Sequence, residues 1–192
     1  MQSQEDLKNH FSPQLGTGER LLWAGQPRQG LFLRATDWVQ IPFSLLWGGF
    51  ACFWEWSAFQ TDAPLFFRLW GVPFVLIGIY LVAGRFFVDA RLRSKTYYAL
   101  TSERAIILSG WLITRTTSLQ LRAMSDVSLI ESPGGFGTIT FGATTPWWTG
   151  SPGWPGSRYR ISPAFDSIAE VRYVYDTLRR AQQSWNPDPT RK

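Results

Sequence analysis

Two long apolar runs dominate the first half of the chain. The first covers residues 38–58 and is uncharged apart from Glu55, and the second covers residues 65–84 and carries a single charge, Arg68. About 20 helical residues, at 1.5 Å each, cover the roughly 30 Å hydrocarbon core of a bilayer. A buried helix of a water-soluble protein rarely stays apolar on every face. The pattern therefore predicts a transmembrane helical hairpin over residues 38–86, and the alternative is a pair of buried core helices.

The two charges in these runs lie near predicted ends. Arg68 comes early in the second span, where its long side chain can reach the interface. Glu55 lies beside the exit of the first span and is interpreted as an acid at headgroup level. The alternative is an intramembrane carboxylate of a transporter, for which a two-span hairpin is too small without assembling.

Beyond Lys95 the pattern changes to short β-rich runs bounded by turn residues. Six such runs at regular spacing indicate a small antiparallel barrel or sandwich. The predicted strands cover residues 96–101, 104–109, 112–121, 127–131, 138–141 and 159–161.

One helix is predicted to close the chain. Ser167 with Glu170 resembles a capping box, and Ile168, Val171, Tyr175 and Leu178 recur at helical spacing on one face. The sequence is thus divided into four parts. They are an N-terminal segment (1–37), the helical hairpin (38–86), a domain of strands and one helix (96–184) and a Pro-rich tail (185–192).

Flanking charge sets the expected orientation. Basic residues precede the first span and follow the second, whereas the connecting turn offers only Arg68 beside Glu55 and Asp62. By the positive-inside rule, both termini and the 96–184 domain are cytoplasmic, on a multi-pass protein of the plasma (inner) membrane. The net charge of +5 includes no basic run along a helix face, so nucleic acid is not an expected partner.

Residues for catalysis are missing from the sequence pattern. It has no phosphate loop with lysine, no His-Glu-x-x-His and no Gly-x-Ser-x-Gly. The single cysteine, Cys52, excludes an intramolecular disulfide and a multi-cysteine metal site, and the lone histidine, His10, is expected to be solvated. We therefore expect neither an enzyme nor a bound cofactor or metal.

Several stretches together resemble one known family. They are GERLLWAGQP from residue 18, YYALTSERAIILSG from 97, SDVSLIES from 125, GGFGTITFG from 134 and FDSIAEVRYVYDTLRRAQ from 165. Their order is similar to that in the bacterial pleckstrin-homology (PH) domain family of small membrane proteins. There, a Glu-x-x-Leu-Trp-x-Gly lead-in precedes a helical hairpin, and a Leu-Thr-x-x-Arg turn follows a tyrosine-rich strand. The resemblance implies an α+β membrane protein in which the hairpin is followed by a PH-like antiparallel β-barrel of seven strands, capped by the C-terminal helix.

Three functions are compatible with this organisation. The first is a membrane-anchored scaffold or interaction module that binds a protein partner or a second copy of itself. The second is a sensor of anionic lipid or a small ligand that uses Arg115, Arg122, Arg158 and Arg160. Phosphoinositide binding is disfavoured because the loop from Ser102 to Arg104 holds one arginine beside an acid. The third is a subunit of a larger membrane complex.

The stretch TPWWTGSPGWPGS, residues 145–157, carries three tryptophans among prolines and glycines and cannot be a helix. Exposed indoles would be an apolar liability, so Trp147, Trp148 and Trp154 are expected to pack on the domain or to contact the membrane interface. A partner or ligand site is the remaining alternative.

Overall fold

The structure is a computed structural model that describes residues 4–31, 33, 37–62, 64–110, 114–124, 126–132, 134–142 and 162–185. The chain divides into two units. The sheet unit comprises Met1–Gln29, Arg91–Pro146 and Ile161–Lys192, and the hairpin unit comprises Gly30–Ala90 and Trp147–Arg160.

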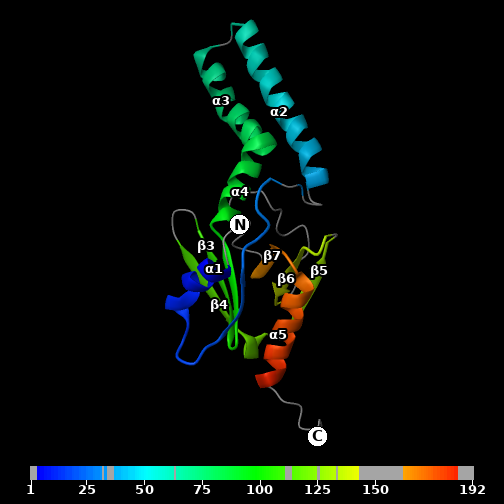
Figure 1. The fold of residues 1–192 in the computed structure, drawn as a ribbon. Helices are drawn as coiled ribbons and strands as arrows, with labels where there is room; N and C mark the ends of the chain where they lie inside the picture. The colour runs from blue at the N-terminus through cyan, green and yellow to red at the C-terminus, as the bar shows by residue number, and fades with distance from the viewer. Residues whose placement is uncertain are drawn as a thin grey trace. The chain divides into compact units, whose positions relative to one another are not determined.

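Seven described strands form two antiparallel sheets in the sheet unit (Figure 1). The first sheet has the order β1-β2-β3-β4, and the second has the order β5-β6-β7. Their bounds are β1 Leu21–Gly25, β2 Tyr97–Thr101, β3 Arg104–Ser109, β4 Arg115–Gln120, β5 Val127–Glu131, β6 Gly137–Phe141 and β7 Ala164–Ile168. The chain is therefore of the α+β class, as predicted.

The expected closed barrel is not found among the described strands. After β4, a 3₁₀ turn at Leu121–Ala123 leads into the second sheet, and β4 does not pair with β5. Each sheet keeps two edge strands, and closure requires that no edge remain. Two sheets around a shared core, rather than one barrel, describe this unit.

The shared core joins both sheets and the C-terminal helix α5 (Val171–Trp185). Alternate residues of β2 and β3, such as Leu100 and Ile107, face this core, and Phe165 of β7 is fully buried within it. α5 contributes one face of buried residues, namely Val171, Val174, Leu178 and Ala181. Of the predicted apolar stripe, Val171 and Leu178 are buried on this face, Tyr175 is partly buried, and Ile168 lies in β7 instead of the helix.

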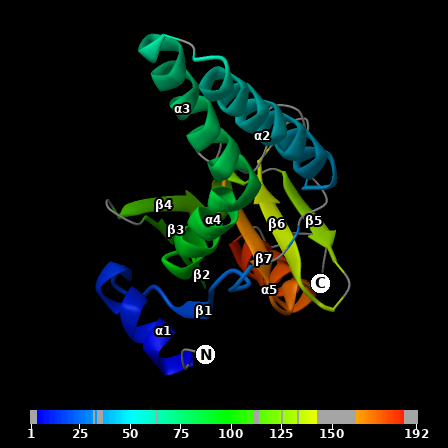
Figure 2. The same ribbon diagram turned by 90° about the horizontal axis from the view of Figure 1, so that it is seen from above.

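The opposite face of the first sheet is covered by an N-terminal helix, α1 (Gln4–Phe11). Leu7 and the fully buried Phe11 pack there against Ala99 and Ile106. Figures 1 and 2 show α1 beside this sheet. Because β2 and β3 are covered on both faces, they read as continuous apolar runs in the sequence.

The predicted capping box is wrong. Ser167 lies inside strand β7 and Glu170 lies in the turn before α5, and both have positive φ, +49° and +52°. Ser167 is fixed by its backbone, since its N–H donates to Thr138 Oγ1 at 3.2 Å and its carbonyl accepts from Arg28 N at 2.8 Å. The strand predicted at residues 159–161 lies outside the described residues.

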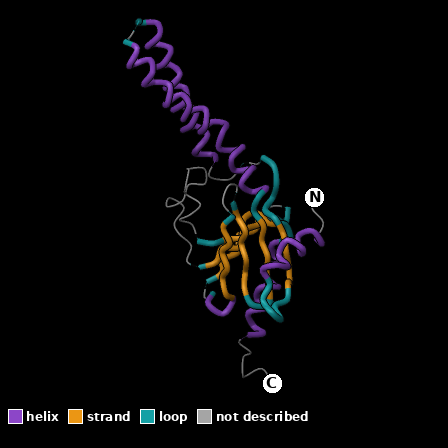
Figure 3. Tube along the Cα trace, turned by 90° about the vertical axis from the view of Figure 1, so that its left-hand side faces the viewer, coloured by secondary structure: helices purple, strands orange, loops and turns teal. Residues whose placement is uncertain are grey.

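In the hairpin unit, α2 (Asp37–Gln60) packs against α3 (Leu65–Ile79) as an antiparallel pair (Figure 1). α3 continues through a π-helical turn at Tyr80–Gly84 into α4 (Arg85–Ser94), so one helix extends from Leu65 to Ser94. The purple trace in Figure 3 follows both long helices. Both predicted apolar runs are helical, and the second helix extends ten residues beyond its predicted end.

By length and composition, one helix among the described residues qualifies to cross a membrane, Leu65–Ser94. α2 is long enough but less apolar, because it includes polar residues such as Gln40, Ser44 and Glu55. The hairpin is inserted between two adjacent strands, since β1 precedes it in the chain and β2 follows it.

Candidate functional site

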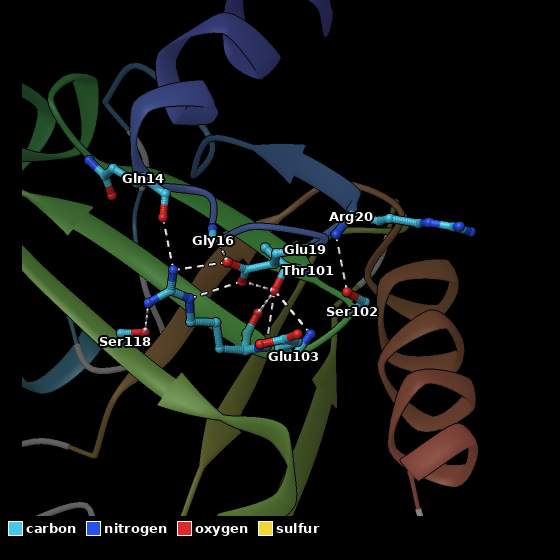
Figure 4. Close-up of polar contacts among 9 residues, drawn as sticks. Gln14, Gly16, Glu19, Arg20, Thr101, Ser102, Glu103 and Ser118 are labelled. Carbon is cyan, nitrogen blue, oxygen red and sulfur yellow. Dashed lines mark hydrogen bonds and ion pairs between the residues drawn. The ribbon is translucent and has the colours of Figure 1, made fainter.

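A densely bonded polar site of the sheet unit is centred on Glu19, just before β1 (Figure 4). Gly18, with φ of +83°, turns the chain so that the Glu19 side chain enters the protein, where it is 2% exposed. Its Oε2 accepts a hydrogen bond from Gly16 N at 2.7 Å. Its Oε1 accepts one from Thr101 Oγ1 at 2.6 Å.

Arg104, the first residue of β3, makes a two-point ion pair with the same carboxylate. Its Nε lies 2.9 Å from Glu19 Oε1, and its Nη2 lies 2.9 Å from Glu19 Oε2. The guanidinium also donates to the Gln14 carbonyl at 2.8 Å and to Ser118 Oγ at 3.3 Å. Every arm of the guanidinium is therefore engaged within the chain, as the dashed lines of Figure 4 show.

Thr101 organises the tight turn between β2 and β3. Its buried hydroxyl accepts hydrogen bonds from the backbone N–H groups of Glu103 and Arg104, at 3.2 and 2.9 Å. The hydroxyl proton is then available to Glu19. We call Glu19, Thr101 and Arg104 the carboxylate lock, because they fasten the segment before β1 to the β2–β3 turn.

The lock changes the acidity of Glu19. Burial alone would raise the pKa of this carboxyl, but hydrogen bonds from Arg104, Thr101 and Gly16 outweigh burial and lower the pKa from 4.5 to about 2. The hydrogen bond to Glu19 raises the pKa of Arg104 in turn. Both groups therefore stay charged across the physiological pH range, so the ion pair does not switch with pH there.

The lock explains two stretches that carried the family resemblance. Glu19 belongs to the lead-in GERLLWAG, and Thr101 and Arg104 belong to the turn LTSER. Sequence reasoning noted both stretches but missed their pairing. It also did not predict β1, which puts the lead-in beside β2. Because Arg104 is committed to Glu19, the β2–β3 turn offers no free arginine for a phosphate.

Two other lead-in residues pack together. The Trp23 ring lies 5.7 Å from that of Phe165, at the edge of the shared core. A Cβ at Gly25 would overlap the Trp23 ring. Glycine is therefore required at position 25 for this placement of the indole.

The structure describes two of the four arginines predicted to bind anionic headgroups. Arg115 begins β4 and Arg122 follows its end, so about five strand steps of 3.3 Å, roughly 17 Å, separate the ends of the strand between them. The two arginines therefore do not converge on one headgroup. Arg158 and Arg160, like Trp147, Trp148 and Trp154, lie outside the described residues.

Two features of the described residues bear on ligand binding. No cluster of three metal-binding side chains occurs there. A shallow pocket of about 280 Å³ lies between β1 and the start of α5, bordered by Lys8, Trp23, Glu170 and Tyr173 among others. Its lining is mainly polar and open, unlike the enclosed apolar pockets that usually bind small molecules.

The hairpin unit contains a second polar site. Arg85 is 4% exposed, and its Nη2 lies 3.3 Å from Asp37 Oδ1, while its Nη1 donates to Gln40 Oε1. The pair joins the start of α2 to the start of α4. We call Asp37 and Arg85 the base clasp.

Small side chains line the contact between α2 and α3. Buried positions include Ser44, Ala51 and Ala58 on α2 and Gly71 and Gly78 on α3. A Cβ at Gly78 would lie 3.0 Å from the α2 backbone, so the two helices approach closely there. Most large apolar side chains of the two helices are exposed, and Trp47 of α2 meets Phe74 of α3 beside this contact, with ring centres 6.3 Å apart.

The fold and these sites define an α+β protein with two antiparallel sheets, a carboxylate lock and a helical hairpin that has one helix long and apolar enough to cross a membrane. Comparison with protein-family models, curated proteins and solved structures finds no match to this chain.

Proposed function

We propose that this chain is a membrane-anchored, non-enzymatic interaction module. In this proposal the hairpin unit crosses the bilayer twice, and the sheet unit is a PH-like domain at the cytoplasmic face. The domain presents its surface to a protein partner or to a second copy of the chain.

The observation that carries the proposal is the inverted burial of the hairpin. Trp38, Leu46 and Phe66 are 85%, 75% and 66% exposed, whereas the buried positions of the two helices, apart from Asp37, are glycine, alanine and serine. Large apolar side chains would face inward in a water-soluble helix pair. In a bilayer, large apolar groups face lipid and small residues allow close helix packing.

The same inversion supports α2 as a second span despite its lower hydropathy. Asp37 and Gln40 bond to Arg85, the Ser44 hydroxyl bonds to the Ile41 carbonyl at 2.9 Å, and Glu55 faces α3. The polar groups are thus turned away from the exposed surface. Pro42 and Pro73 lie inside these helices, as transmembrane segments tolerate.

Two observations support a PH-like domain. Seven strands followed by a C-terminal helix agree with what the resemblance implies, although the strands form two sheets. The carboxylate lock also joins two of the stretches on which the resemblance rests, the lead-in and the Leu-Thr-x-x-Arg turn.

Membrane fractionation of cells that produce the full chain tests the anchor. A double span stays in the pellet after an alkaline carbonate wash, and release into the supernatant would refute it. Orientation is tested with single cysteines at Asp62 and Ser184 in a Cys52→Ser background. Membrane-impermeant maleimide is expected to label intact cells at position 62 only, and labelling at 184 only would reverse the orientation.

Crosslinking in intact membranes tests the interaction role. A photoreactive amino acid is placed on one of two edge strands. One position is the exposed Ile130 of β5, the first strand of the second sheet, and the other is Arg115 of β4, the last strand of the first sheet. A defined adduct with one protein, or with a second copy, is the expected result. A chain that stays uncrosslinked and monomeric from both positions would contradict an interaction role.

A further inference from the structure

Two hairpin residues of opposite charge, Glu55 of α2 and Arg68 of α3, have buried polar atoms that lack a hydrogen-bond partner among the described residues. Both carboxylate oxygens of Glu55 are buried without a partner among the described residues. The Nε of Arg68 is also buried without a hydrogen-bond partner among the described residues. Buried polar atoms in folded proteins are nearly always satisfied, so a pair of such groups needs a physical explanation.

The register of the helix pair places these two groups close together. A Cβ added at Gly71 would overlap the Glu55 carboxylate, so this carboxylate occupies the notch that Gly71 leaves in α3. Gly48, seven residues before Glu55 in α2, lies against Gly78, seven residues after Gly71 in α3, which fixes an antiparallel register. Arg68 precedes Gly71 by three residues, about 4.5 Å along the axis and nearly one turn. An arginine side chain is long enough to cover that offset.

Arg68 currently binds elsewhere. Its Nη2 lies 2.9 Å from Asp62 Oδ1, and its guanidinium lies 5.4 Å from the centre of the Phe59 ring. The Asp62 side chain is 97% exposed, so this is a surface ion pair of the kind that contributes little to stability. Arg68 therefore loses little if it leaves Asp62.

The base clasp shows the same pairing at the other end of the hairpin. There, a carboxylate of α2, Asp37, binds an arginine of the following helix, Arg85, with both side chains at most 10% exposed. Glu55 lies 18 residues after Asp37, and Arg68 lies 17 residues before Arg85. In an antiparallel pair these nearly equal steps give Glu55 and Arg68 nearly the same axial offset as Asp37 and Arg85.

We propose that, in the bilayer, Arg68 turns from Asp62 to Glu55 and forms an interhelical ion pair, which we call the tip clasp. Each end of the hairpin is then held by an ion pair between a carboxylate of α2 and an arginine of the next helix. The inference rests on the proposed membrane location, because the low dielectric there makes two separate charges costly and their pairing favourable. Without lipid the same arginine remains with the exposed Asp62. The tip clasp thus fixes the register of α2 against α3.

The test uses the full chain in lipid nanodiscs of phosphatidylcholine and phosphatidylglycerol. Tryptophan fluorescence follows the opening of the hairpin as sodium dodecyl sulfate is added. The first variants are Glu55→Gln, Arg68→Gln and their double variant. The second set comprises the reversed single variants Glu55→Arg and Arg68→Glu and the charge-swapped pair that combines them. Asp62→Asn is the matched control, since it removes the partner that Arg68 has at the surface.

The expected result is that the two single substitutions are not additive and that the charge-swapped pair is more stable than either reversed single variant. The opening equilibrium constant is expected to show a coupling of about 3-fold to 20-fold, the range found for polar pairs in membranes. Asp62→Asn is expected to leave the midpoint unchanged. Additive single effects, or an Asp62→Asn effect equal to that of Arg68→Gln, would overturn the tip clasp.

The outcome can be separated from failure of the membrane proposal. If a single variant does not fold, the comparison of the charge-swapped pair with the reversed single variants still decides. If the wild-type chain is released by carbonate, the membrane location fails. In that case the tip clasp fails as well, whereas a chain that stays in the pellet but shows additive single effects overturns the tip clasp alone.

Discussion

Replacing Glu19 by glutamine keeps the shape of the side chain but removes the charge on which the carboxylate lock depends. The amide can still accept a hydrogen bond from Thr101, but its NH₂ group faces the N–H of Gly16 and the guanidinium of Arg104, both of which are donors. The substitution therefore loses the ion pair and places donors against donors. Arg104 is 31% exposed, so water can solvate part of its guanidinium after the change.

The size of the effect follows from the pKa of Glu19. The difference between 4.5 and about 2, at 1.36 kcal/mol per pKa unit, corresponds to about 3 kcal/mol of folding free energy. Because the pKa is lower in the folded chain, this stability is fully present above pH 4.5 and is lost as the pH falls towards 2. The wild type should exceed Glu19→Gln by about 3 kcal/mol at pH 7, and the difference should shrink between pH 4.5 and 2.

Urea denaturation of the full chain in mild detergent, followed by the β-sheet circular dichroism signal, measures this difference at a series of pH values. Glu103→Gln is the matched control, because it makes the same chemical change at an exposed neighbouring position. A Glu19→Gln effect below about 1 kcal/mol at pH 7, or an effect that persists unchanged at pH 2, would refute the reasoning.

Three further substitutions test packing. Gly78→Val places a branched side chain against the α2 backbone, which lies 3.0 Å from the new Cβ, and should loosen the hairpin in a detergent crosslinking assay. The control Gly49→Val enters open space and should leave the hairpin unchanged. Gly137→Ala would overlap a backbone oxygen of β5 and a side chain of α5, and thermal unfolding should show a loss of at least about 1–3 kcal/mol. Phe165→Ala removes a fully buried ring and should cost about 3–5 kcal/mol in urea, while Ile130→Ala, at a 61% exposed position, should change stability by less than about 0.5 kcal/mol. Equal effects for Phe165 and Ile130 would contradict the assigned core.

Elements with a strong local signal could be predicted from the sequence. The helices α2 and α3 follow from two unbroken apolar runs, and β2 and β3 follow from β-branched and aromatic residues on either side of a two-residue turn. The pairing of β1 with β2 left no such local signal in the sequence. β1 is five residues long and pairs with a strand more than seventy residues away, so nothing local identifies it as a strand.

The failed capping box shows how tertiary contacts override a local motif. Ser167 and Glu170 have the right spacing, but Phe165 and Ile168 are fully buried in the shared core from strand β7. Pairing of β7 with β6 keeps the chain extended to Ile168, and α5 begins only at Val171. The carboxylate lock was missed for a related reason, since Glu19 and Arg104 are distant in sequence and only the β1–β2 pairing joins them.

The insertion of the hairpin between β1 and β2 also favours one order of folding over another. Pairing Gly25 with Tyr98 directly would close a loop of 71 residues, 26–96, at an entropic cost of about 4 kcal/mol. If the base clasp forms first, the effective loop falls to the 22 residues of 26–36 and 86–96, and closure becomes about 1 kcal/mol cheaper. The hairpin should therefore assemble before the first sheet is complete. β1 is synthesised first among the strands but must wait unpaired until both long helices and β2 have been made.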